Sequence, residues 1–123
     1  DGIAGDAARL LGVTLGKDSL ENETVVGVVI KLLEGGFNYQ ALLTFALSKA
    51  GAENNRDVVE ILYSNVAGGL EAPESIVDAL AAQLDKGILS RGSLAAYAAG
   101  LDDLATQIDL VGLTQTGLEY ATV

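Results

Sequence analysis

A segment from the middle of the chain occurs twice. Residues 84–94 (LDKGILSRGSL) and residues 32–42 (LLEGGFNYQAL) show the same order of features: a helix end, a glycine stop, a short apolar link, a polar N-cap and a new helix start. Gly35 and Gly87 set the offset between the copies at 87 minus 35, or 52 residues. An offset that aligns all these features predicts an internal repeat.

The same offset aligns apolar residues on both sides of the glycines. Upstream it superimposes two stripes with the i, i+3, i+4, i+7 spacing of a helix face, which are Val25, Val28, Val29 and Leu32 in one copy and Val77, Leu80, Ala81 and Leu84 in the other. Downstream it superimposes Leu42, Phe45 and Ala46 on Leu94, Tyr97 and Ala98. The polar caps Asn38 and Ser90 also coincide. These matches predict the same pair of helices in each copy.

A further helix precedes each pair. Ile3–Thr14 and Asp57–Val66 have helical apolar spacing, and Pro73 with Glu74 suits the start of the second copy's long helix. We therefore predict an all-α fold in which tandem duplicated three-helix units form a helical bundle.

The predicted organisation is one domain, 1–123, with repeat units 1–51 and 52–103 and a capping segment 104–123. Asp109 is expected to open a last helix through about Ala121 that covers the second unit with Leu110, Leu113 and Leu118. The two stripes are expected to pack on each other across a pseudo-two-fold axis, because a unit of about 50 residues buries too little apolar surface alone.

Composition excludes several functions. Seventeen acidic residues against seven basic ones give a net charge of −10, which argues against binding nucleic acid. Cysteine and histidine are absent, so disulfides, a Ser-His-Asp triad and the usual zinc, copper and iron ligands are excluded. No apolar run approaches the roughly 20 residues that span a bilayer, so we expect no transmembrane segment. We expect no enzymatic activity.

Ser19 is the residue on which an alternative function depends. The tripeptide Asp18-Ser19-Leu20 resembles the phosphopantetheine attachment motif of acyl carrier proteins, which places Asp-Ser-Leu at the start of an acidic helix. Only 18 residues precede Ser19, fewer than the first helix and loop of a carrier need. The alternative is an acyl or peptidyl carrier modified on Ser19, whereas our main interpretation is that Ser19 caps or precedes the second helix.

Carboxylates and aromatic residues suggest two other kinds of site. Asp102 and Asp103 are weak candidates for a calcium site, since calcium takes oxygen ligands, although no calcium-loop motif is present and solvated surface carboxylates explain them as well. Glycoside hydrolysis is disfavoured because the chain has no tryptophan and few aromatic residues to line sugar subsites. The aromatic residues in or beside the stripes are expected to pack in the core; they are Tyr39, Phe45, Tyr63 and Tyr97.

Two turn motifs carry a resemblance to a known family. Residues 15–17 (LGK) and 67–69 (AGG) stand at the first turn of each unit, and Leu32–Gly35 and Leu84–Gly87 form Leu-x-x-Gly. This pattern resembles the helical repeat of domain of unknown function 4214, with Val28 and Leu80 where that family has tryptophan. The family occurs, usually in multiple copies, in bacterial surface-layer and type-I-secreted proteins that often carry calcium-binding repeats.

The resemblance implies a setting and a role. It implies a secreted or cell-surface bacterial protein and contributes no catalytic residues. We therefore expect a non-catalytic structural domain that mediates assembly or attachment, with other domains or copies of the parent protein, or cell-surface glycan, as partners. Calcium is the one cofactor that this setting suggests.

Overall fold

The computed structural model describes residues 2–110, 112–113 and 117–123. Within these residues the chain is all-helical and contains no strand, which confirms the predicted fold class. The elements in chain order are α1 (Gly2–Thr14), the 3₁₀ helix η1 (Lys17–Glu21), α2 (Glu23–Glu34), α3 (Tyr39–Lys49), α4 (Asn55–Val66), α5 (Glu74–Asp85), α6 (Arg91–Ala99) and α7 (Asp102–Gln107). None of the helices in the described part is long and apolar enough to cross a membrane.

Polar side chains start the helices, as predicted for the two matching caps. The Asn38 side chain accepts a hydrogen bond from the Ala41 N–H at 2.9 Å, and the Ser90 hydroxyl accepts one from the Ser93 N–H at 3.0 Å. These oxygens satisfy N–H groups that have no partner within the first turn of α3 and of α6. The two caps therefore fix where both helices begin.

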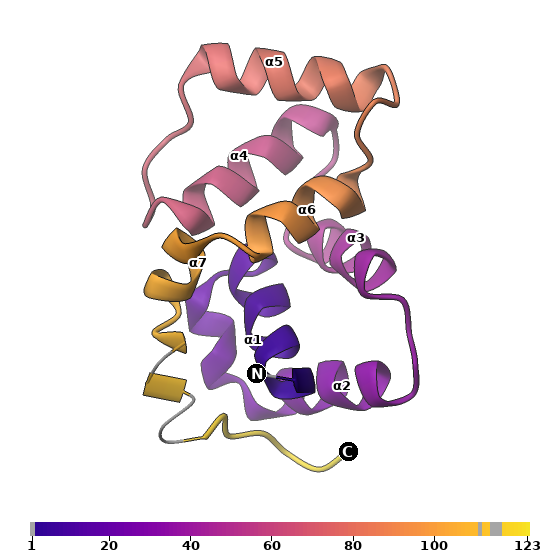
Figure 1. The fold of residues 1–123 in the computed structure, drawn as a ribbon, viewed down its shortest axis with the longest axis vertical. Helices are drawn as coiled ribbons and strands as arrows, with labels where there is room; N and C mark the ends of the chain where they lie inside the picture. The colour runs from indigo at the N-terminus through magenta and orange to yellow at the C-terminus, as the bar shows by residue number, and fades with distance from the viewer. Residues whose placement is uncertain (1, 111, 114–116) are drawn as a thin grey trace.

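The helices pack as two groups that share one core. In the first group α1 contacts α2 and α3, and in the second α4 contacts α5 and α6. The groups meet where α1 packs on α4 and α3 packs on α6 (Figure 1). Gly92 permits the second crossing, because a Cβ there would come within 2.8 Å of the Gln40 carbonyl oxygen. One hydrophobic cluster includes buried residues from both groups.

The predicted contact between the two apolar stripes is wrong. Figure 1 places α2 and α5 at opposite ends of the molecule, with α3 and α6 between them. α2 packs on α1 and α5 packs on α4. Leu84 in the stripe of α5 is buried, whereas Leu32 in the stripe of α2 is only half-buried and Val28 is exposed. The duplication itself stays a prediction, although contacts between positions 52 residues apart, such as Gln40 with Gly92, are what a two-fold arrangement of two copies would produce.

The C-terminal segment also differs from the prediction. A helical turn does begin after Asp109, since Leu110, Gly112 and Leu113 are helical and the Leu113 N–H donates to the Asp109 carbonyl oxygen at 2.9 Å. Residues 117–123 have no helical structure, so a helix that continues through Ala121 is wrong. The predicted helix also covers residues 111 and 114–116, which lie outside the described residues. Leu110, Leu113 and Leu118 are partly buried against the core, as expected of contact residues.

The end of this segment covers the first group and not the second. The Ala121 N–H donates to the Glu23 carbonyl oxygen at 2.9 Å, and the Lys31 ammonium donates to the Val123 carbonyl oxygen at 2.8 Å. Between them, Gly27 leaves room for the Ala121 carbonyl. Glu23, Gly27 and Lys31 lie four residues apart on one face of α2, and the chain end runs along that face.

Candidate functional site

Ser19 lies in η1, before the first residue of α2. Its hydroxyl donates to the Gly16 carbonyl oxygen at 2.7 Å and lies 3.4 Å from the Leu11 carbonyl oxygen. The N-cap of α2 is Asn22, whose side chain accepts from the Val25 N–H. Ser19 therefore precedes the second helix, as our main interpretation had it, and its hydroxyl holds the turn after α1.

Asp102 and Asp103 form the first turn of α7, where two carboxylates suit a helix N-terminus. Both side chains are exposed. Among the described residues, no group of three or more acidic side chains is placed to hold a metal ion. Calcium binding by Asp102 and Asp103 therefore stays a hypothesis, and the described residues provide no third acidic ligand beside them.

An apolar groove opens between α1, α2 and α3, and we call it the first groove. It has a volume of about 300 Å³. Its lining is aliphatic or aromatic apart from Thr24 and Lys49; the apolar lining residues are Leu10, Leu11, Leu15, Val25, Val28, Val29, Leu32, Leu42, Phe45 and Ala46. The side chain of Phe45 is at its edge and is 60% exposed.

A similar groove, which we call the second groove, opens between α4, α5 and α6. It has a volume of about 190 Å³. Apart from the Tyr63 and Tyr97 hydroxyls its lining side chains are hydrocarbon; the lining residues are Val59, Leu62, Tyr63, Val66, Leu80, Leu94, Tyr97, Ala98 and Leu101. Tyr97 is 69% exposed.

The two grooves are built from corresponding positions. A separation of 52 residues relates most of the second lining to the first: Leu10 to Leu62, Leu11 to Tyr63, Val28 to Leu80, Leu42 to Leu94, Phe45 to Tyr97, Ala46 to Ala98 and Lys49 to Leu101. The expectation that Phe45 and Tyr97 pack in the core is wrong, because α3 and α6 bury other faces against each other. The aromatic residues instead form matching exposed edges.

Lys49 in the first groove and Leu101 in the second occupy corresponding positions but differ in charge. The Lys49 ammonium lies 5.3 Å from the centre of the Phe45 ring, so the first groove carries a cation over its aromatic edge. Leu101 takes the corresponding position in the second groove and is followed directly by the exposed Asp102 and Asp103. The two grooves are therefore similar in apolar lining and opposite in the charge beside it.

An acidic hollow is lined by other residues of α4 and α5, the helices that also line the second groove, and by the loop between these two helices. Its volume is about 360 Å³, and its lining includes Glu60, Glu71 and Glu74. Arg56 already pairs with Glu74 and Asp78, at 2.5 and 2.7 Å. Glu60 and Glu71 are exposed. The second unit thus places negative charge next to an apolar surface.

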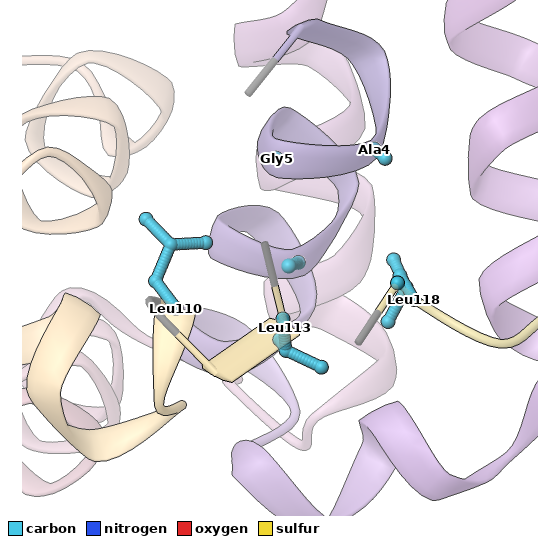
Figure 2. Close-up of a pocket in the computed structure, with 7 residues that line it drawn as sticks. Ala4, Gly5, Leu110, Leu113 and Leu118 are labelled. Atoms are coloured by element: carbon cyan, nitrogen blue, oxygen red, sulfur yellow. The ribbon is translucent and has the colours of Figure 1, made fainter. Parts of the chain in front are cut away.

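Another apolar hollow, of about 260 Å³, lies between the first turns of α1 and the C-terminal segment. Figure 2 shows Leu110, Leu113 and Leu118 beside the small residues Ala4 and Gly5 of α1. The leucines cover the start of α1 loosely, because alanine and glycine leave space between the two segments. This hollow belongs to the packing of the chain end.

The grooves do not follow from the sequence pattern, although the 52-residue offset aligns many of their residues. The one signal for them is the aromatic residue at corresponding positions of the predicted repeat, Phe45 and Tyr97. The described linings are apolar apart from Thr24 and Lys49 in the first groove and the Tyr63 and Tyr97 hydroxyls in the second, and such surfaces suit binding. Comparison with protein-family models, with curated proteins and with solved structures finds no match for this chain.

Proposed function

We propose that this chain is a non-catalytic interaction domain of a secreted or cell-surface bacterial protein, which mediates assembly or attachment to surface components. The observation that carries the proposal is the pair of matching apolar grooves, each edged by an exposed aromatic side chain. Exposed apolar surface of this kind is typical of sites that contact other proteins. The secreted setting is supported by the acidic, cysteine-free composition and by the family resemblance.

The linings favour protein partners over glycan. Sugar sites need polar groups that bind hydroxyls, and the groove linings offer almost none. Other domains or further copies of the parent protein are therefore the proposed partners. The carrier alternative gains no support from the position of Ser19, because its hydroxyl donates to backbone carbonyls within a turn.

Sedimentation velocity of the chain over a range of concentrations tests the proposal. We expect the average mass to rise reversibly with concentration, because the grooves of one copy bury apolar surface of another. The double variant Phe45→Ser and Tyr97→Ser removes both aromatic edges and should associate less. The matched control is Phe37→Ser with Ile88→Ser, which changes two equally exposed apolar residues outside the groove linings.

Two outcomes would contradict the proposal. One is a chain that stays monomeric throughout and is not retained by a bacterial cell-envelope preparation. The other is association that the control variant weakens as much as the groove variant does, since the contact surface would then lie elsewhere.

A further inference from the structure

We infer that the second groove, between α4, α5 and α6, binds a cationic amphipathic helix of a partner protein. This inference rests on the proposed function and names the partner of one of its two surfaces. It is argued from the size of the groove, from the charges beside it and from the contrast with the first groove.

The size of the second groove fits side chains and not a whole small molecule. Its volume of about 190 Å³ is below the roughly 300–1,000 Å³ of typical ligand pockets. A helix lying in a groove inserts a few leucine-sized side chains at i, i+3 or i+4, and i+7. The groove lies between three helices, so the occupying helix would contact α4, α5 and α6 together.

The carboxylates beside the groove favour a bound helix whose polar face is cationic. Glu60 lies one turn before Tyr63 on α4, and Asp102 and Asp103 follow Leu101; all three carboxylates are exposed. Glu60 of α4 and Glu71 of the loop before α5 also line the acidic hollow. Lysine or arginine on the partner helix can pair with these carboxylates while its apolar face fills the groove.

The charge of the whole chain acts in the same direction. A net charge of −10 attracts a cationic helix from a distance and repels an anionic helix, most strongly at low salt. Among the described residues that line the second groove there is no lysine or arginine. Arg56, the cation near the acidic hollow, is already held by Glu74 and Asp78.

The first groove provides the contrast within the same molecule. Its apolar lining corresponds position by position, but Lys49 stands where the second groove has Leu101. An ammonium at this edge repels a cationic helix. The second groove is therefore the binding site for this partner. The substitution Leu101→Lys gives its edge the positive charge that Lys49 gives the first groove.

Fluorescence anisotropy with two synthetic peptides tests the inference on the full chain at low concentration. Both peptides have about 18 residues, long enough to form a helix, with leucines on one face. One carries lysine at every polar position and the other glutamate. We expect saturable binding of the lysine peptide at one site per chain, weaker binding as salt rises, and no binding of the glutamate peptide.

Variants locate the site. Leu101→Lys should weaken binding of the lysine peptide by about tenfold or more, and Tyr97→Ser should also weaken it. The control Phe37→Ser should bind like the unchanged chain, since Phe37 lines neither groove. If Leu101→Lys disturbs folding, as judged by circular dichroism, the triple variant Glu60→Gln, Asp102→Asn and Asp103→Asn keeps the groove and should reduce the salt dependence.

Other results overturn the inference. Equal binding of both peptides would show that charge does not select the partner, and binding lost in Phe45→Ser but kept in Tyr97→Ser would place it in the first groove. Saturable binding of laurate that displaces the lysine peptide would assign the groove to an acyl chain. Self-association through the grooves without peptide binding would overturn this inference while supporting the proposed function.

Discussion

The side-chain amide of Asn65 on α4 donates to the carbonyl oxygen of Val13 at the end of α1, at 2.8 Å, and lies 3.1 Å from that of Thr14. The last carbonyls of a helix have no partner within it, so Asn65 supplies one from the other helix group. Val13 and Asn65 are 52 residues apart, which is the offset of the predicted repeat.

Replacing Asn65 by alanine removes both hydrogen bonds and leaves partly buried carbonyl oxygens without this donor. We expect the free energy of unfolding to fall by about 1–3 kcal/mol, measured by urea denaturation. Asn65→Asp should cost at least as much, because a carboxylate presents only acceptors to the carbonyls. Ser48→Ala, at an exposed position, is the control, and a loss below about 0.5 kcal/mol for Asn65→Ala would show that the contact contributes little.

Gly27 on α2 decides whether the chain end can lie against that helix. Alanine in a helix interior is favoured over glycine by about 1 kcal/mol, but a Cβ on Gly27 would overlap the Ala121 carbonyl oxygen. We expect Gly27→Ala to release the C-terminal residues without stabilising the fold. Carboxypeptidase should then remove the last residues faster than in the unchanged chain.

Gly5→Ala is the matched control for Gly27→Ala. Gly5 is also within a helix, and a Cβ there would meet no atom within 4 Å. This substitution should raise the free energy of unfolding by about 0.5–1 kcal/mol and leave digestion of the chain end unchanged. Equal digestion rates for the two variants would show that the chain end does not depend on Gly27.

Tyr39 makes the free energy of unfolding depend on pH in the alkaline range. Burial, with a smaller contribution from Asp6 and opposed by Arg9, raises the pKa of the Tyr39 phenol to about 12. An unfolded tyrosine titrates near 10, so the folded chain holds this proton more tightly. The contribution is therefore complete below pH about 10 and is lost as pH rises from about 10 to 12.

Tyrosinate absorbance and denaturation over this pH range measure the effect. Tyr39→Phe should remove an absorbance step near pH 12 and make the loss of stability between pH about 10 and 12 less steep. An unchanged titration curve in the variant would show that Tyr39 titrates with an ordinary pKa.

The two helix groups should not fold separately. Leu43 on α3 and Ala95 on α6 are fully buried in the one cluster that includes both groups, so a half-chain exposes core residues. We expect residues 1–51 alone to be molten or to associate, because a unit of this size buries too little apolar surface. Dispersed amide NMR resonances and a sharp thermal transition for a monomeric half-chain would contradict this.

The sequence by itself determined most of the helices and their ends, although not the extent of the last one. Caps such as Asn38 and Ser90 and stops such as Gly35 and Gly87 act within one or two turns, so their effect can be read from neighbouring residues. The long helices α2 and α5 both carry clear apolar stripes. The stripe of α5 is mostly buried, as the local pattern predicts, but α2 buries Val26, Gly27 and Ile30 and leaves its stripe along the first groove.

The tertiary structure decided which faces meet and which stay open. Apolar residues surround most of α3, namely Leu42, Leu43, Phe45, Ala46 and Leu47, so periodicity cannot select the buried face. The buried face is set by the crossing of α3 and α6, where Gly92 packs closely on Gln40. This crossing leaves Phe45 and Tyr97 exposed and separates α2 from α5. The place of the chain end on α2 depends on Gly27, which is 94 residues from Ala121. Such contacts join distant parts of the chain, and the grooves depend on them because no single helix contains a groove.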